Sequence, residues 1–184
     1  MNILVINGFE EHRDANGQLN HRLFTEYVRQ LKTQHNIRVS FATEYQRADE
    51  INKWLWADLI IIQCPIYWFN VPGQLKSYYD DVFAYGIFYG LYYTRYGQGG
   101  RLIGKKFMLS TTWNAPESAF NDNNEFFNGM RVADILMPTI KALEFVGVTP
   151  WSRDGVIAYH DVIHSPQFEL YLSQQAQFID EVNA

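Results

Sequence analysis

Residues 8–17 are the first segment whose residue types could do chemistry, because basic side chains precede a glycine at the start of a helical pattern. Asn16 is a favoured helix N-cap residue, and Gly17 lets a backbone approach closely. A helix N-terminus suits a phosphate or pyrophosphate, which His12 and Arg13 could also contact. Many α/β loops end in Asn-Gly without binding anything. Neither GxGxxG nor GxxxxGKS/T occurs in this loop, so the hypothesis is a phosphate site of another type.

Residues 64–72 carry three consecutive aromatic side chains, Tyr67, Trp68 and Phe69, directly after an apolar run. Three successive aromatics at the end of a strand cannot all face a core, and Pro65 and Pro72 stiffen the segment. A rigid aromatic loop that exposes its backbone suits a planar heteroaromatic ring. A dimer contact or a buried aromatic cluster explains the same residues equally well, so both interpretations stay open.

Residues 111–120 place hydroxyl, amide and backbone donors after another apolar run, with Thr112 and Asn114 among them. Donors at this position could stabilise negative charge on a bound ring, although a polar turn before a helix would have the same composition. Together the three loops offer a phosphate end, a flat-ring end and a set of donors between them. A flavin nucleotide has these three parts, and it is the ligand that we predict.

Short apolar runs alternate with stretches of helical periodicity along the whole chain. The apolar runs predict strands at residues 2–7, 37–41, 59–64, 106–112 and 156–159. The helical periodicity predicts helices near residues 19–31, 51–55, 72–83, 132–146 and 167–182. Pro138 should bend the fourth helix or mark its true start. This alternation is typical of an α/β protein, and 184 residues favour one domain spanning residues 1–184.

The simplest arrangement of these elements is a flavodoxin-like open five-stranded parallel sheet, order 2-1-3-4-5, with helices on both faces. In that order the loops after strands one, three and four meet at one edge of the sheet, around the switch point. The three loops described above are therefore predicted to converge on a single ligand. A structure that separated residues 67–69 from residues 112–114 would refute the prediction.

Composition and charge argue against several classes of partner. The net charge of −5 argues against a general nucleic-acid binder, which needs a basic patch. No apolar run approaches the roughly 20 residues that span a bilayer, and the N-terminal residues lack the basic segment of a signal peptide. Cys64 is the single cysteine. An internal disulfide is therefore impossible, and we expect a reducing, cytoplasmic setting.

A few residues outside the three loops invite chemistry, but each has a plainer explanation. His160 and His164 have i, i+4 spacing, yet Pro166 makes a helix doubtful there, and two histidines do not fill a zinc shell. We expect solvated histidines and no metal site. The adjacent Asp80 and Asp81 indicate solvated charges at the end of a helix. Cys64, directly after an apolar run, is expected to be a small buried hydrophobic residue.

Several uncommon short peptides recur in the order and spacing of a known family. The most specific is TWNAP at residues 112–116, followed by Ala119 and Phe120. The others are NGQLN at residues 16–20, LWAD at 55–58, YYDDVF at 78–83, YGQGG at 96–100 and GKK at 104–106. Through these peptides, which span most of the chain, the sequence resembles the flavodoxin-like NAD(P)H:quinone oxidoreductase family.

The resemblance implies FAD, with FMN as the alternative, and NADPH or NADH as co-substrate. It also implies a homodimer with active sites near the interface. Two departures concern the pocket: Ile66 and Tyr67 stand where relatives carry Gly and Trp, and residues 84–95 form a shorter, more aromatic segment. Trp68 and Phe120 are implied substrate contacts. The implied flavin-binding residues are His12, Ala15, Asn16, Gly17, Gln18, Leu19, Asn20, Arg22, Pro65, Ile66, Tyr67, Trp68, Phe69, Tyr96, Thr112, Trp113, Asn114 and Ala115.

The activity implied by the resemblance is a two-electron, ping-pong reaction. Hydride passes from the nicotinamide to flavin N5, and a quinone or similar small aromatic oxidant then takes it. Donors in residues 112–114, assisted by Tyr96, are expected near N1 and O2 of the ring, and the N–H groups of Trp68 or Phe69 near O4 and N5. Three alternatives stay open: an azo, nitro or ferric reductase, a non-enzymatic flavodoxin-type electron carrier, and a binding module without catalysis.

Overall fold

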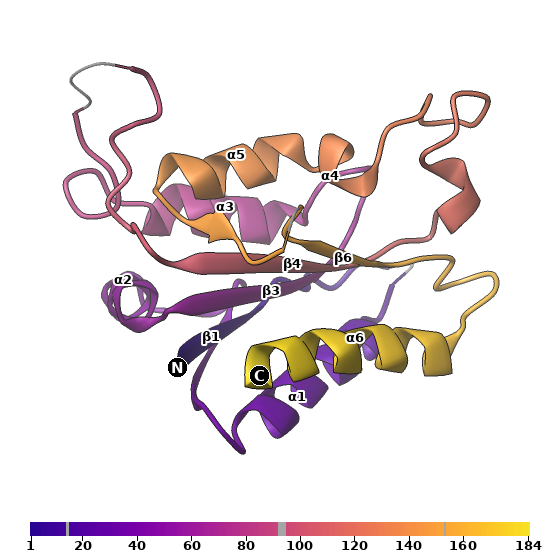
Figure 1. The fold of residues 1–184 in the computed structure, drawn as a ribbon, viewed down its shortest axis with the longest axis horizontal. Helices are drawn as coiled ribbons and strands as arrows, with labels where there is room; N and C mark the ends of the chain where they lie inside the picture. Colours follow the sequence, from indigo (N-terminus) through magenta and orange to yellow (C-terminus); the bar gives the residue numbers. More distant parts are fainter. Residues whose placement is uncertain (14, 92–94, 153) are drawn as a thin grey trace.

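The computed structural model describes residues 1–13, 15–91, 95–152 and 154–184, and places a parallel sheet between two layers of helices (Figure 1). None of the helices within these residues is long and apolar enough to cross a membrane. The strands are β1 Asn2–Asn7, β2 Asn36–Phe41, β3 Leu59–Pro65, β4 Lys106–Thr112, β5 Thr149–Pro150 and β6 Val156–Tyr159. The helices are α1 Gln18–Leu31, α2 Arg47–Trp56, α3 Gly73–Val82, the short 3₁₀ turn η1 Glu117–Ala119, α4 Val132–Ile135, α5 Met137–Phe145 and α6 Phe168–Asn183.

The strand order confirms the predicted topology. The sheet runs β2-β1-β3-β4-β5, and β6 also pairs with β4. The predicted fifth strand is β6, which joins the second half of β4 with Leu109 opposite Val156. The sequence prediction missed β5, whose two residues pair with the start of β4, where Lys106 lies opposite Thr149. All these pairings are parallel, so the carboxyl ends of β1, β3, β4 and β6 lie at one edge of the sheet.

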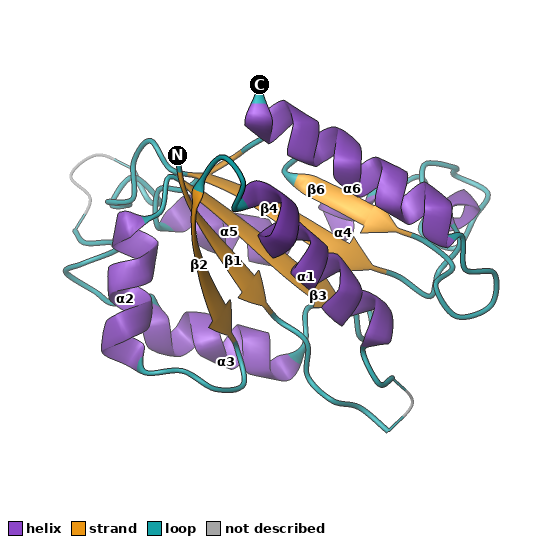
Figure 2. Cartoon of the chain, turned by 90° about the horizontal axis from the view of Figure 1, so that it is seen from below, coloured by secondary structure: helices purple, strands orange, loops and turns teal. Residues whose placement is uncertain are grey.

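The two faces of the sheet bury alternate residues of the same strands. Ile3 and Val5 pack with the side chains of α1 and α6, whereas Leu4 and Ile6 pack with those of α2, α3 and α5. Successive strand side chains point to opposite faces, which explains why β1 and β3 are apolar without alternation. Figure 2 shows α1 and α6 lying side by side over one face of the strands.

Local geometry explains where two of the helices start, and the expectation that Pro138 marks a helix start is confirmed. Pro138 lies in the first turn of α5, where its missing N–H costs nothing, so the predicted long helix is two helices with Pro138 at the start of the second. The prediction that Asn16 caps the first helix is wrong. Gly17 is the N-cap residue, in a left-handed conformation with φ 69°, and the Oδ1 of Asn16 lies 3.5 Å from the N of Gln18.

Arg131 joins the start of α4 to the turn before β6. Its Nη2 lies 2.9 Å from Oδ1 of Asp134, and its Nη1 lies 2.8 Å from Oδ1 of Asp154. The hydrogen bonds from Arg131 hold the pKa of Asp134 below its usual value of 3.8. A depressed carboxylate pKa stabilises the fold above the unfolded value and loses that contribution as the pH falls through the folded pKa.

We therefore expect Arg131→Met to lower the melting temperature by a few degrees at neutral pH, because the three charged groups are only partly exposed. The deficit should shrink below pH 3.8, as Asp134 becomes protonated in both proteins. Thermal unfolding of the two proteins from pH 7 to pH 3 measures this difference. A deficit that stayed constant over that range would contradict the assignment to the ion pairs.

Candidate functional site

The three loops predicted to converge do lie together at the carboxyl edge of the sheet. The Ile66 N–H donates to the carbonyl of Thr112 over 2.9 Å, which joins the second loop to the third. The Tyr67 hydroxyl donates to the carbonyl of Glu10 over 2.9 Å, which joins the second loop to the first. The observation that would have refuted the topological prediction is therefore not found.

A hollow of about 760 Å³ lies between these loops, a size typical of pockets for small molecules and cofactors. Thirteen of the sequence-predicted residues line it: His12, Ala15, Asn16, Gly17, Gln18, Leu19, Asn20, Pro65, Ile66, Tyr67, Trp68, Thr112 and Asn114.

The first loop ends in a cradle for an anion. Gly17 begins α1 with φ 69°, and no acidic side chain lies in the first turn of that helix. A Cβ at position 17 would clash with the ring of Phe9, which also lines the hollow, so only glycine fits there. The free N–H groups and positive dipole end of the helix face a space that His12 also lines. These residues fit the phosphate of a nucleotide cofactor.

The second loop is a strained tight turn. Tyr67 and Asn70 exchange backbone hydrogen bonds of 2.9 and 3.1 Å, and both residues between them, Trp68 and Phe69, have positive φ of 48° and 66°. Left-handed backbone costs an L-residue roughly 1–2 kcal/mol, so two in succession are a feature of functional sites. Within the described chain the N–H groups of Trp68 and Phe69 have no hydrogen-bond partner, and the Trp68 side chain is 90% exposed.

An aromatic wall continues from this turn into the segment after β4. Phe69 contacts Phe126 and Phe127, with ring centroids 5.7 and 5.3 Å apart. Phe127 stacks on Phe120 at 4.5 Å, but Phe120 itself is 3% exposed. The predicted substrate contact Phe120 therefore supports the wall from behind. Phe126, which is 70% exposed, presents the outer surface that the sequence prediction missed.

Five further predicted flavin-binding residues do not line the hollow. Trp113 is 2% exposed and its Nε1 donates to Oγ1 of Thr111, so its side chain belongs to the core. Ala115 accepts a backbone hydrogen bond from Asp161 beside the pocket. Those outside the lining are Arg22, Phe69, Tyr96, Trp113 and Ala115.

Tyr96 lies at the opposite end of the sheet from the pocket. Its ring packs on Phe145, the last residue of α5, at 5.5 Å. The N–H of Leu102, four residues before β4 begins at Lys106, donates to the carbonyl of Val146, the residue after Phe145. Thr112, at the pocket, ends the same strand, so about 20 Å separates the two ends. The predicted segment 84–95 includes residues 92–94, which lie outside the described residues.

The loop after β6 and the first residue of α6 supply three pocket residues that the sequence prediction missed. Val162, Ile163 and Phe168 form an apolar side of the hollow, next to Asn114. The Val162 N–H donates to the carbonyl of Trp113 over 3.1 Å, which fixes this loop against the third. The predicted strand order contained the signal, because the fifth strand also ends at this edge. Phe9, Glu11 and Arg13, in the first loop, complete the lining.

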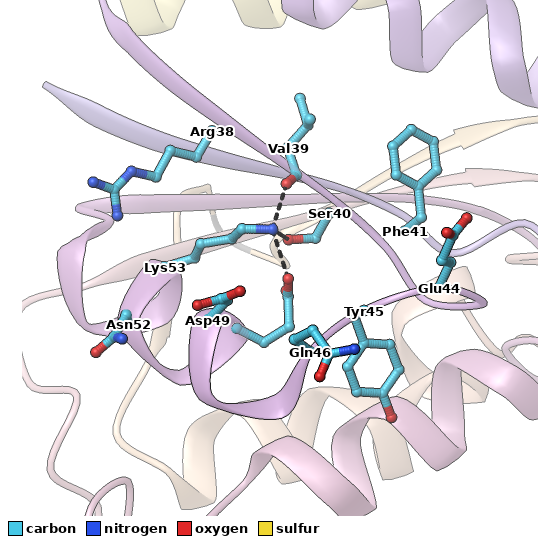
Figure 3. Close-up of a pocket in the computed structure, with 11 residues that line it drawn as sticks. Arg38, Val39, Ser40, Phe41, Glu44, Tyr45, Gln46, Asp49, Asn52 and Lys53 are labelled. Carbon is cyan, nitrogen blue, oxygen red and sulfur yellow. Dashed lines mark hydrogen bonds and ion pairs between the residues drawn. The ribbon is translucent and has the colours of Figure 1, made fainter.

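A second hollow, of about 550 Å³, lies at the β2 edge of the sheet and is lined by residues of β2 and α2 (Figure 3). Its central cation, Lys53, donates to the Val39 carbonyl, to Oγ of Ser40 and to Oε1 of Glu50. Glu50 is 1% exposed and also accepts a 2.7 Å hydrogen bond from Tyr78. Lys53 thus donates to a main-chain carbonyl of the edge strand β2, so this carbonyl is not open to a strand of another chain.

Other candidate reactive groups lie outside the pocket. Cys64 is fully buried, and burial raises the pKa of its thiol to about 12, so it is not a reactive thiolate. His160 packs on Phe120 at 5.0 Å, and Nε2 of His164 lies 3.5 Å from Nδ2 of Asn114, in a turn rather than a helix. Among the described residues, no group of three or more His, Cys, Asp or Glu side chains could hold a metal ion.

The comparisons with known proteins agree with this architecture. A family model described as a flavodoxin-like fold matches residues 1–177. NADPH:quinone oxidoreductase MdaB (modulator of drug activity B) of Haemophilus influenzae is 36% identical over 195 residues, which cover 99% of each chain. The family resemblance that the short peptides indicated is thereby confirmed.

Solved structures of the same fold extend the comparison. A proposed quinone reductase from Klebsiella pneumoniae superposes with a TM-score of 0.76 at 22% identity, covering 100% of this chain and 84% of the other. General stress protein 14 of Treponema denticola, in complex with FMN, gives a TM-score of 0.70 at 23% identity and covers 98% of each chain. At these identities the likeness establishes the fold alone.

Proposed function

This chain belongs to the family of the flavodoxin-like fold, and from that membership we propose that it is an NAD(P)H-dependent flavoprotein that reduces quinones or similar small aromatic oxidants. The observation that carries the proposal is the pocket itself. A glycine-capped helix start and a strained turn, which reaches the lining through Tyr67 and Trp68, border one hollow of about 760 Å³. A flavin nucleotide needs this combination of an anion cradle and a rigid polar edge.

The proposed role of the protein is to bind and orient the cofactor. When bound, the flavin supplies two-electron chemistry, accepting reducing equivalents from the nicotinamide and releasing them to the oxidant. The start of α1 and His12 would hold the phosphate. The N–H groups of Trp68 and Phe69, fixed by their turn, would bind polar atoms of the ring, and Thr112 and Asn114 would offer donors on the other side. Fixed donors need no reorganisation during the reaction.

We propose FAD rather than FMN as the cofactor. The hollow continues past the start of α1 to the apolar side formed by Val162, Ile163 and Phe168. Ile163 and Phe168 are 58% and 46% exposed and line the same side of the hollow, so together they present an apolar surface that a ligand can cover. An adenine ring is flat and apolar on both faces, so it suits this surface, whereas FMN ends at its phosphate.

A homodimer with composite active sites is part of the proposal. The described chain exposes a carboxyl-edge patch, Trp68, Phe69, Phe126 and Met130, and an amino-edge patch, Tyr85, Ile87, Leu91 and Tyr96. Figure 1 places the segments after α3 and after β4, which hold most of these residues, at opposite ends of the α3 and α5 layer. A two-fold axis would place the carboxyl-edge patch of each subunit against the amino-edge patch of the other. Tyr96 would then face the flavin of the partner subunit.

Three measurements on the purified protein, in a buffer free of thiol reductants, test the function. We expect a yellow protein that releases FAD, identified by mass spectrometry, and that oxidises NADPH or NADH with quinone as acceptor. Initial rates at several fixed acceptor concentrations should give the parallel double-reciprocal lines of a ping-pong reaction. Azo, nitro and ferric acceptors, assayed beside the quinones, separate the related reductase activities. A colourless protein that binds neither added FAD nor FMN would overturn the proposal.

A further inference from the structure

A row of polar side chains crosses the interior beneath the pocket. Asn7 of β1, Gln63 of β3 and Ser110 of β4 are direct register partners, so their side chains lie on the same face of the sheet. Asn20 of α1 completes the row from above. These four side chains are at most 7% exposed. Because buried polar groups are costly unless fully paired, a row of this length calls for a specific role.

The hydrogen bonds of the row run in one direction. Ser110 Oγ donates to Oε1 of Gln63 over 2.7 Å, and Nε2 of Gln63 donates to Oδ1 of Asn20 over 3.0 Å. Nδ2 of Asn20 then donates to Oδ1 of Asn7 over 3.0 Å. Oδ1 of Asn7 also accepts the backbone N–H of Phe9 over 3.0 Å. A backbone N–H can only donate, so the contact with Phe9 fixes the orientation of the Asn7 amide. The Asn20 amide is then held from two sides, by Asn7 at its nitrogen and by Gln63 at its oxygen.

The hydroxyl end of the row lies outside the lining of the pocket. Tyr27 is 2.9 Å from Ser110 and 3.2 Å from Tyr159, and all three are fully buried. Burial raises the pKa of both tyrosines, so both are neutral hydroxyls that can donate toward Ser110. The row therefore begins at the tyrosine hydroxyls, which can donate to Ser110, and ends at the backbone of Phe9 in the first pocket loop.

Asn20 connects the row to the ligand. It lies in the first turn of α1 and lines the hollow, whereas Gln63 does not. An amide nitrogen carries two N–H groups. Asn7 accepts one of them, so the second is available to a ligand at the phosphate end. An amide turned over by half a revolution would present its carbonyl oxygen there and would repel a phosphate.

We propose that Gln63 is a positioning residue: as the central link of this row, it fixes the Asn20 amide with an N–H available to the phosphate of the bound flavin nucleotide. The inference rests on the proposed function and deepens it. Gln63 acts through Asn20 and touches no ligand atom. Its removal should therefore weaken the recognition of the phosphate and leave the recognition of the ring unchanged.

The test compares FMN with riboflavin, which lacks the phosphate, by fluorescence titration of the apoprotein. We expect Gln63→Met to reduce the ratio of the riboflavin Kd to the FMN Kd by about tenfold, the effect of losing one charge-assisted hydrogen bond. The Kd for riboflavin itself should change by less than about twofold, since the turn at residues 67–70 is untouched. A packing defect would instead weaken both ligands together.

Gln175→Met is the matched control. Gln175 is as fully buried as Gln63, and its Nε2 donates to the Leu23 carbonyl outside the path from Ser110 to Phe9. This variant should lose stability without changing the Kd ratio. If Gln63→Met does not fold, Gln63→Leu replaces it, because leucine also cannot donate to Oδ1 of Asn20 and the same loss is expected.

A double-mutant cycle identifies the route of the effect. If Gln63 acts through Asn20, adding Gln63→Met to Asn20→Ala should not reduce the Kd ratio further. An unchanged ratio in Gln63→Met, or fully additive losses in the double variant, would overturn this inference and leave the proposed function standing. Wild-type protein that bound neither FAD, FMN nor riboflavin would overturn both.

Discussion

Gly17→Val is expected to abolish retention of the flavin during purification. Gly17 has φ 69°, a conformation that costs an L-residue roughly 1–2 kcal/mol and a β-branched one more. The new Cβ would also clash with the Phe9 ring, and overpacking of this kind typically costs about 1–3 kcal/mol. The loop can relieve both only by moving away from the start of α1, which removes the anion cradle. A combined effect of about 2–5 kcal/mol corresponds to at least roughly a thirtyfold weaker Kd.

Gly104→Val is the matched control for that experiment. Gly104 has φ 85°, so valine there meets a similar backbone penalty, but its Cβ would contact nothing within 4 Å. Position 104 lies before β4, at the edge of the sheet opposite the pocket. We expect a lower melting temperature and an unchanged flavin Kd for Gly104→Val. A Gly17→Val protein that kept a Kd close to the wild-type value would show that the start of α1 does not hold the phosphate.

The placement of the pocket was predictable from the sequence because the alternation of strands and helices, joined by right-handed crossovers, leaves few possible strand orders. Runs such as Leu59 to Cys64 are apolar on both faces, and this pattern requires a central parallel strand between two helical layers. Once strand order was inferred, the loops at one edge followed. The same reasoning could have found Ile163 and Phe168, since the loop after the last strand ends at that edge as well.

The direction of each loop side chain was not predictable in the same way. Trp113 and Trp68 follow neighbouring strands with similar local composition, yet the first is 2% exposed and the second 90%. The exposure of each side chain depends on backbone φ angles and on contacts with segments distant in sequence, such as the packing of Phe120 between Trp113 and Phe127. Peptide patterns carry no information on these contacts. The peptide match predicted that Tyr96 contacts the flavin, whereas within one chain Tyr96 lies outside the lining of the pocket.

Tyr96→Ala is expected to lower kcat/KM for the quinone by up to about tenfold, and a partner chain should restore the loss. Tyr96 is 79% exposed and lies beyond the far end of β4, a strand about 20 Å long that ends at the pocket of its own chain, so an effect on activity requires a second subunit. An aromatic contact contributes roughly 0.5–1.5 kcal/mol beyond the burial of its area. Sedimentation of the wild-type protein should give the mass of two chains of 21.6 kDa. Steady-state kinetics of the purified variant measures the loss.

Mixing the Tyr96→Ala chain with the Gly17→Val chain separates a contribution from the partner from one within the chain. In a dimer of Tyr96→Ala chains every site lacks the tyrosine, and in a dimer of Gly17→Val chains every site lacks an intact flavin pocket. In a mixed dimer, the intact pocket of the Tyr96→Ala chain faces the intact Tyr96 of its partner, so one of the two sites is complete. Random pairing makes about half of the dimers mixed, and therefore restores about a quarter of the wild-type activity. If Tyr96 served its own pocket, refolded mixtures would show no more activity than the sum of the two variants, because neither chain carries both residues.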